Sequence, residues 1–276
     1  MNDNNPKGVA HLKGHLSDLE EWFSSHTHTI TAFSGGVDSA LVLYLSYKFL
    51  GKRAIGCISI SPSLKRSDYA TAIAFCKQYK IRLEIIETKE IDDPNYFNNP
   101  SNRCYFCKSH LYQHLKQVSL KYPESSLLNG TNTDDISDYR PGIKAADELD
   151  IFSPLVDCGI TKQTVRDLAN YFGLPNSNKP ASPCLSSRIP YGSVVTREKL
   201  SRIEQAEEIL AKYGFNDTRV RHFDETASIE VPYEQIGALE NIMPQVGLIF
   251  KGLGFRSVSI DREGLVSGKL NRPIRA

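Results

Sequence analysis

Hydrophobic and polar residues alternate along the first 170 residues in a pattern of strands followed by helices. Apolar residues at helical spacing predict an amphipathic lead-in helix over residues 9–25. The β-rich run 27–33 leads into the glycine-containing segment SGGVDSA, and an apolar helix follows over 41–50. The alternation continues with strands at 54–60, 81–87, 126–129 and 151–153 and helices at 69–79, 107–120 and 161–171. This order predicts an α/β fold, with a parallel sheet, right-handed crossovers and helices on both faces.

The pattern changes after residue 174. Residues 174–192 (LPNSNKPASPCLSSRIPYG) are rich in Pro, Ser and Asn, which predicts a functional loop at a domain boundary. A small α+β domain is predicted beyond it, with helices at 196–213 and 233–253 and strands at 218–222, 227–231 and 256–261. We therefore expect two domains: residues 1–192, which include cysteine-bearing loops at 100–108 and 176–192, and residues 193–276.

Composition and charge narrow the class of protein. The 276 residues are 40% hydrophobic and 24% charged, which is ordinary for a globular protein. No window has the roughly 18 apolar residues of a membrane span, and the N-terminal sequence does not resemble a secretory signal, so we expect a cytoplasmic protein. The 33 basic and 32 acidic residues argue against a nucleic-acid partner, although transient RNA contact stays open. The oligomeric state, including a homo-oligomer, also stays open.

The strongest local signal is the segment SGGVDS between a predicted strand and a predicted helix. It consists of Ser34, Gly35, Gly36, Val37, Asp38 and Ser39. The glycines let backbone N–H groups face inward, and the helix adds its positive N-terminal dipole, so the segment predicts a polyphosphate cradle. It lacks the G-x-x-x-x-G-K-[ST] pattern and is therefore not a Walker A loop. An ordinary glycine turn before a helix is the alternative interpretation.

A second polar loop follows the strand predicted at 126–129. It contains Asn129, Gly130, Thr131, Asn132, Asp134 and Asp135. The carboxyl ends of parallel strands meet at one edge of a sheet, so we expect this loop to lie beside SGGVDS. The carboxylates of Asp134 and Asp135 are candidate Mg²⁺ ligands. An Asx-rich turn that caps the next helix is the alternative.

The segment SGGVDS resembles the PP-loop signature S-G-G-x-D-S of the N-type ATP pyrophosphatases, which include GMP synthetase, NAD synthetase and tRNA thiolases. Together with SDYRPGIKA at 137–145 and KPASPCLSSRIPYG at 179–192, it resembles the LarE family of sulfur insertases. The resemblance continues through 219–221 and 229–232 and so covers nearly the whole chain. It implies an adenine nucleotide alpha hydrolase-like fold for the large domain.

The resemblance also implies a reaction. LarE enzymes use MgATP to adenylate the carboxylates of pyridinium-3,5-biscarboxylic acid mononucleotide, and sulfur then replaces AMP to give thiocarboxylates for the nickel-pincer nucleotide. The implied ATP contacts are Ser34, Gly35, Gly36, Asp38, Ser39, Asn129, Gly130 and Thr131. The implied substrate contacts are Arg140, Ser187, Arg188, Arg219 and Arg221, because guanidinium groups bind phosphate and carboxylate bidentately. Surface arginines on solvated faces are the alternative.

Six cysteines are too few for a disulfide framework in a chain of this length. LarE proteins are of two kinds: one consumes a single loop cysteine as the sulfur source, and the other holds a [4Fe-4S] cluster on three cysteines that passes on sulfur from sulfide or another donor. Cys104, Cys107 and Cys184 resemble the three-cysteine kind. The resemblance therefore implies that Asp38 and Cys184 are catalytic and that the three cysteines hold a cluster.

Other interpretations of these residues remain. The C-x-x-C pair can be a redox dithiol or half of a zinc site that Cys158 or His110 completes, whereas Cys57 and Cys76 are expected to be buried apolar residues. A tRNA thiolase and a non-catalytic nucleotide-binding protein are the competing functions. Glu230 is expected to be the outward residue of an alternating strand, with a metal or substrate ligand near the active loop as the alternative.

Overall fold

The computed structural model describes residues 6–136, 141–180, 182–266, 268, 269 and 272. Two compact units divide the chain. The first comprises Met1–Ser61, Arg66–Lys89 and Cys104–Ser182, and the second comprises Pro62–Lys65, Glu90–Arg103 and Pro183–Ala276. In the described part of the chain, no helix is long and apolar enough to cross a membrane.

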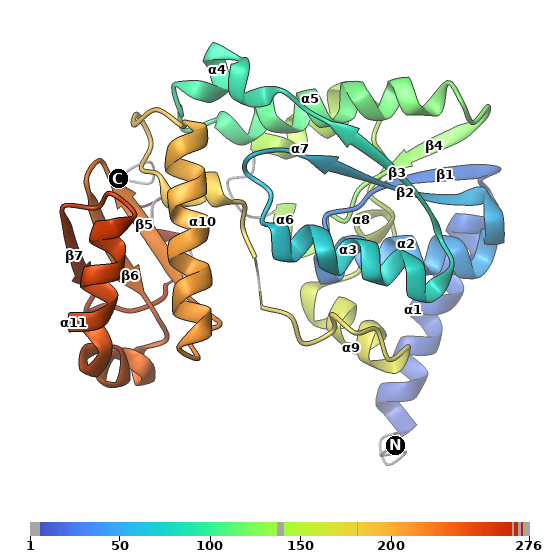
Figure 1. The fold of residues 1–276 in the computed structure, drawn as a ribbon. Coiled ribbons are helices and arrows are strands. Elements are labelled where there is room, and N and C mark those ends of the chain that lie inside the picture. The colour runs from blue at the N-terminus through green and yellow to red at the C-terminus, as the bar shows by residue number, and fades with distance from the viewer. Residues whose placement is uncertain (1–5, 137–140, 181, 267, 270–271, 273–276) are drawn as a thin grey trace. The chain divides into compact units, whose positions relative to one another are not determined.

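The first unit contains a parallel four-stranded sheet of order β3-β2-β1-β4 (Figure 1). Its strands are β1 (His28–Ala32), β2 (Ala54–Ile60), β3 (Arg82–Glu87) and β4 (Ser125–Leu128). Ile30 of β1 lies opposite Ile55 of β2 and Leu127 of β4. In the sheet, β2 and β3 lie on one side of β1, and β4 lies on the other. The loops after β1 and β4 therefore meet at a topological switch point, where ligands bind in sheets of this type.

Helices cover both faces of this sheet (Figure 1). On one face, Ile30, Ile55 and Leu127 form a core with α5 and α7. On the other, Leu43 of α2 lies close to Gly56 of β2. Because α1 and α9 contact the outer side of α2, its residues are buried nearly all round. The helices of this unit are α1 (Pro6–Ser24), α2 (Val37–Leu50), η1 (Gly51–Arg53), α3 (Arg66–Tyr79), α5 (Arg103–Ser119, whose first residue belongs to the second unit), α6 (Thr133–Ile136), α7 (Pro141–Glu148), α8 (Pro154–Asp157) and α9 (Lys162–Tyr171).

The second unit contains a mixed three-stranded sheet of order β5-β6-β7. Its elements are η2 (Glu90–Asp92), α4 (Pro94–Phe97), η3 (Leu185–Arg188), α10 (Arg197–Lys212), β5 (Arg219–Phe223), β6 (Thr226–Glu230), η4 (Tyr233–Gln235), α11 (Ile236–Gly252) and β7 (Ser257–Ile260). β5 and β6 are antiparallel and β6 and β7 are parallel. Leu210 of α10 and Phe250 of α11 join Val220 and Ile229 of the sheet in one apolar core.

The structure confirms the predicted fold class and revises some elements. The strand expected at 151–153 is reduced to one bridge between Phe152 and Leu128, and the short helices α4, α6, α7 and α8 lie where no helix was predicted. A domain boundary at 192/193 remains a prediction. The second compact unit begins earlier, at Pro183, and also takes in residues 62–65 and 90–103.

Candidate functional site

The segment SGGVDS forms a tight loop between β1 and α2. Gly35 has φ of 75°, a left-handed conformation that favours glycine. The Ser39 hydroxyl accepts from the Ser34 N–H at 3.3 Å and donates to the Gly36 carbonyl at 3.2 Å, which closes the loop. Gly36 is the N-cap of α2 and supplies no side-chain acceptor. The first N–H groups of α2 therefore keep the arrangement that binds phosphate at helix N-termini.

Gly130 brings the loop after β4 against this helix terminus. A Cβ atom on Gly130 would lie 2.6 Å from the Ser39 nitrogen and 2.9 Å from the Ser39 Cα. Backbone atoms cannot move aside as a flexible side chain can, so only glycine allows this approach. The two loops that the sequence placed at one sheet edge are thus in contact in the first unit.

Asp38, in the first turn of α2, is held by two side chains from distant segments. Its Oδ1 accepts from the Asn132 amide at 3.1 Å, and its Oδ2 lies 2.5 Å from the Lys162 ammonium. Lys162 was not among the residues predicted from the sequence. The one local sign of its position is Thr161, a side-chain N-cap residue after which α9 begins at Lys162. The ammonium brings a positive charge next to the predicted phosphate cradle.

The loop after β4 has the geometry of a capped turn. Asp134 accepts from the Lys162 backbone N–H at 2.9 Å, and Asp135 accepts from the Asn132 N–H at 3.2 Å. Asn129 accepts from the Thr131 N–H at 2.8 Å, whereas its amide nitrogen is buried without a hydrogen-bond partner in the described part of the chain. The Asx-turn interpretation therefore describes the local structure, and Mg²⁺ binding by Asp134 and Asp135 remains a prediction.

Asp68, in the first turn of α3, joins the PP-loop to the segment that precedes Cys184. Its carboxylate lies 2.8 Å from the Lys179 ammonium and accepts from the Ser182 hydroxyl at 2.8 Å. Its carbonyl packs against Gly35, where a Cβ atom would be only 3.0 Å away. Asp68 could not be predicted as a site residue from the sequence, because its partners Lys179 and Ser182 lie more than 100 positions later in the chain.

Arg188 is buried in the second unit, with 1% of its surface exposed. Its Nε and Nη2 donate to the Glu207 carboxylate at 2.7 and 3.1 Å. Its Nη1 donates to the Pro183 carbonyl at 2.8 Å and to the Ser187 hydroxyl at 2.9 Å. Burial would raise the pKa of Glu207, but Arg188 and Lys65 outweigh it and hold that pKa below its ordinary value.

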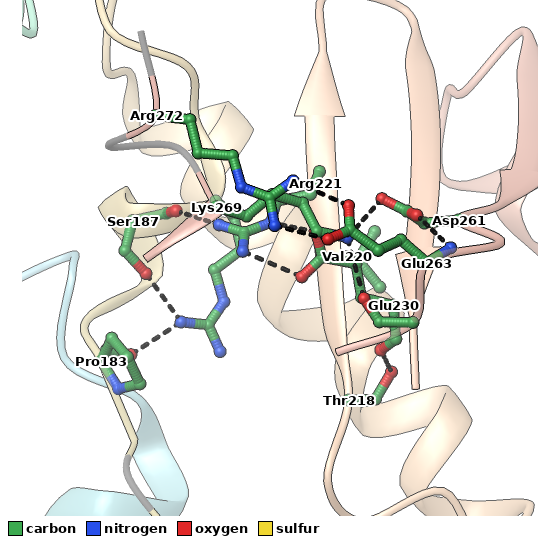
Figure 2. A network of polar contacts seen from close by, with 12 residues as sticks. Pro183, Ser187, Thr218, Val220, Arg221, Glu230, Asp261, Glu263, Lys269 and Arg272 are labelled. Atoms are coloured by element: carbon green, nitrogen blue, oxygen red, sulfur yellow. Dashed lines mark hydrogen bonds and ion pairs between the residues drawn. The ribbon is translucent and has the colours of Figure 1, made fainter. Parts of the chain in front are cut away.

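Arg221 belongs to a second buried network in the same unit (Figure 2). Its guanidinium donates to both Glu230 carboxylate oxygens, at 2.9 and 2.8 Å, and to the Ser187 carbonyl at 2.6 Å. The Lys269 ammonium lies 3.4 Å from Glu230 and 2.7 Å from Asp261. Glu230 is completely buried, so the expectation that it faces outward was wrong. The physical reason is that Arg221 and Lys269 neutralise its charge within the unit.

Arg219 differs from these two arginines. It is half-buried, and its side chain makes no hydrogen bond or ion pair to the described residues. Burial lowers its pKa, and the neighbouring charges of Arg188 and Arg221 lower it further. Arg188 and Arg221 are paired with Glu207 and Glu230, whereas Arg219 has no carboxylate partner among the described residues. A half-buried guanidinium without such a partner favours an anion beside it. Arg140 lies outside the described residues, and the substrate role of Arg140, Ser187, Arg188, Arg219 and Arg221 remains a prediction.

The predicted cluster ligands are divided between the units. Cys104 and Cys107 lie at the start of α5 in the first unit, and Cys184 is exposed in the second. Among the described residues, no group of three or more His, Cys, Asp or Glu side chains is placed to hold a metal. The thiols have the soft donor chemistry that suits iron, and the carboxylates of Asp134 and Asp135 have the oxygen donors that suit Mg²⁺. A [4Fe-4S] cluster remains a prediction.

The other three cysteines lie in surroundings that disfavour the thiolate. Cys57 and Cys76 are buried as expected, and burial raises the pKa of each thiol to about 12. Burial also raises the pKa of Cys158 to about 11. These surroundings favour the protonated thiol at each of the three positions.

Comparison with known proteins gives relatives along nearly the whole chain. A protein of Lactiplantibacillus plantarum named pyridinium-3,5-bisthiocarboxylic acid mononucleotide synthase is 32% identical over 95% of this chain and 93% of its own length. An uncharacterized protein of Synechocystis is 43% identical over 95% of this chain and 98% of its own. A component of the glutamine-hydrolyzing GMP synthase of Saccharolobus solfataricus is 24% identical over 77% of this chain and 61% of its own. The NAD synthase family model matches residues 18–104.

Proposed function

The chain belongs to the LarE-like PP-loop family, and from this premise we propose that it is an ATP-dependent sulfur transferase acting on a pyridinium carboxylate mononucleotide. Family membership implies an ATP-using enzyme that works with Mg²⁺. The finer proposal is that the substrate is pyridinium-3,5-biscarboxylic acid mononucleotide and that its carboxylates become thiocarboxylates. The observation that carries this proposal is the arrangement of Asp38, Lys162 and Gly130 around the PP-loop, combined with the extent of the match to the L. plantarum synthase.

The adenylation step needs the polyphosphate held and its charge neutralised. A substrate carboxylate oxygen attacks the α-phosphorus of ATP, a new O–P bond forms, and the bond to the β-phosphate breaks to release pyrophosphate. We infer that the N–H groups at the start of α2 bind the phosphates and that Lys162, positioned by Asp38, offsets the charge on pyrophosphate as it leaves. Mg²⁺, when bound, supplies further positive charge, with Asp134 and Asp135 as its proposed ligands.

The second step transfers sulfur. A sulfur nucleophile attacks the acyl carbon, the C–S bond forms, and the C–O bond to AMP breaks, so AMP carries away the oxygen. Arg219 is the proposed contact for the substrate's phosphate, because its guanidinium is half-buried beside two other arginines and makes no described contact of its own. We propose that Cys104, Cys107 and Cys184 hold a [4Fe-4S] cluster, which when bound would supply sulfide.

Anaerobic reconstitution with iron and sulfide, followed by a multi-turnover assay with MgATP, the biscarboxylate nucleotide and sulfide, tests this proposal. We expect more than one sulfur transferred per chain, and loss of both iron and sulfur transfer in Cys184→Ala. Cys158→Ala is the matched control, and it should keep both. At most one sulfur per chain, with Cys184 lighter by the elements of H₂S, would show the sacrificial route instead.

Lys162→Met separates the first step from the second. We expect pyrophosphate release from MgATP to fall roughly a hundred-fold, the size expected when a charged group that acts on the leaving group is removed. Lys52→Met removes an exposed lysine from the same unit and should leave the rate unchanged. A chain that releases no pyrophosphate with any variant, the unaltered chain included, would favour the non-catalytic alternative.

A further inference from the structure

The residues around Cys184 are anchored to the rest of the second unit by a buried network. The Leu185 N–H donates to the Ser63 carbonyl at 2.9 Å. Arg188 donates a hydrogen bond to the Pro183 carbonyl and another to the Glu207 carboxylate. The Lys65 ammonium lies 2.6 Å from Oε2 of Glu207, which also accepts from Arg188. Arg103 and Tyr96 additionally bind Ser186.

The residues just before Cys184 are anchored separately within the first unit. Asp68 accepts from the Ser182 hydroxyl and pairs with Lys179, both at 2.8 Å. Asp68 is only 8% exposed, so little solvent screens these contacts. The chain is thus anchored at Ser182 in the first unit and at Pro183 and Leu185 in the second.

Both sets of contacts use one short stretch of chain. Ser63 and Lys65 lie in the connection from β2 to α3, and Asp68 lies in the first turn of α3, so the three residues are within six positions of one another. We propose that this stretch, residues 62–68, is the positioning element for Cys184, with Lys65 and Asp68 as its positioning residues. The proposal rests on the proposed role of Cys184 in sulfur transfer. The contacts of Ser63 and Lys65 also account for the place of residues 62–65 in the second unit, although the residues on both sides belong to the first.

The reason for such an element is the exposure of Cys184. An exposed loop cysteine samples many positions, whereas sulfur transfer requires its sulfur within a narrow range of distance and direction. The anchors on Ser182 and Leu185 restrict the backbone on both sides and leave the side chain itself accessible. Within the first unit, the carbonyl of Asp68 packs on Gly35 of the PP-loop.

Hydrogen–deuterium exchange of the peptide spanning 183–189 tests the proposal without ATP, metal or substrate. In Lys65→Met we expect roughly ten-fold faster exchange of this peptide, because residues 62–65 lose their tie to Glu207 and the Ser63 carbonyl holds the Leu185 N–H less firmly. Arg188 still pairs with Glu207, so the unit should remain folded, with unchanged exchange in α11. Lys65→Arg should restore the protection.

Two further variants complete the test. Lys212→Met removes an exposed lysine from the same unit and should leave exchange of the 183–189 peptide unchanged. Asp68→Asn weakens the anchor on the other side, and we expect faster exchange in the peptide spanning 176–183. Unchanged exchange in both Lys65→Met and Asp68→Asn would overturn the proposal.

The sulfur-transfer assay then gives the functional readout. In Lys65→Met we expect the kcat of sulfur transfer to fall roughly ten-fold while the KM for ATP is unchanged, which a general loss of structure would not produce. If the unaltered chain is active and kcat is unchanged in this variant, the positioning role is contradicted and the proposed function stands. If the unaltered chain transfers no sulfur, the proposed function fails, and the exchange experiment still decides whether residues 62–68 hold the loop.

Discussion

Gly130 lies so close to the first turn of α2 that any side chain would meet backbone atoms. We predict that Gly130→Ala weakens ATP binding at least roughly ten-fold, because the added Cβ would lie 2.6 Å from the Ser39 nitrogen and must push the PP-loop away from the loop after β4. Isothermal titration with ATP measures this change. The prediction is specific to the site, because the clash falls on the residues that would bind phosphate.

Gly237→Ala is the matched control for this substitution. A Cβ atom at Gly237 meets nothing within 4 Å, and the residue lies in the first turn of α11. Alanine should therefore leave ATP binding unchanged and stabilise the helix by up to about 1 kcal/mol. Equal ATP affinity in the Gly130→Ala variant and the unaltered chain would contradict the packing that the structure gives to this glycine.

Residue-scale chemistry also shows what sequence can and cannot reveal. The segment SGGVDS was recognisable because all its members are adjacent and its spacing alone predicts a phosphate cradle. Lys162 and Asp68 were missed because each acquires its partner only through the fold: Lys162 meets Asp38 across 124 positions, and Asp68 meets Ser182 across 114. Glu230 was misplaced because strand alternation carries no information on charged side chains that neutralise it.

At the scale of elements, β5 contains a buried histidine that makes the stability of the second unit depend on pH. His222 is 1% exposed, and neither ring nitrogen has a hydrogen-bond partner in the described part of the chain. Burial and, to a smaller extent, the charges of Arg202 and Lys199 on α10, opposed by Asp224, together lower its pKa from 6.5 to about 4. The imidazole is therefore neutral in the folded unit at neutral pH.

The sign of the pH effect follows from this lowered pKa. Between pH 6.5 and about 4 the unfolded chain binds a proton at His222 that the folded chain does not, so stability falls as the pH falls through this window. The contribution has a slope of at most about 1.4 kcal/mol per pH unit. We predict that His222→Leu removes this slope, as urea unfolding between pH 7.5 and 5 would measure.

The unaltered chain, unfolded in urea over the same pH range, is the reference for this element-scale effect. If His222→Leu and the unaltered chain lose stability in parallel on acidification, the buried imidazole is not the cause, and the titrating group lies elsewhere.

Most elements of the fold were predictable because their patterns are local. The strand at 54–60 has the predicted bounds, since its run of apolar residues is buried almost from end to end. The short helices α6 and α8 were not predictable, because four residues are too few to show helical periodicity. The division into compact units was not predictable from local patterns either. Residues 62–65 join the second unit through contacts of Lys65 with Glu207 and of the Ser63 carbonyl with Leu185, more than 100 positions away.

At the scale of the whole molecule, charge separates the proposed function from its nucleic-acid alternative. The sequence carries 33 basic and 32 acidic residues, and several of the arginines and lysines named above are already neutralised by carboxylates. Phosphate-backbone binding depends on many unpaired cations and the counterions they release. A tRNA thiolase would need a basic face that this balance does not favour.

We therefore predict that unfractionated tRNA binds with a Kd of roughly 10⁻⁵ M or weaker at 150 mM salt, the range of non-specific association. Fluorescence anisotropy with labelled tRNA at 50 and 200 mM salt measures this, and unlabelled biscarboxylate nucleotide should not displace what binds. The reconstituted enzyme should transfer sulfur to the nucleotide and none to tRNA under the same conditions. Sub-micromolar tRNA binding together with thiolated tRNA bases would instead identify the chain as a tRNA thiolase. Both results require a nucleic-acid site, which the charge balance predicts to be absent.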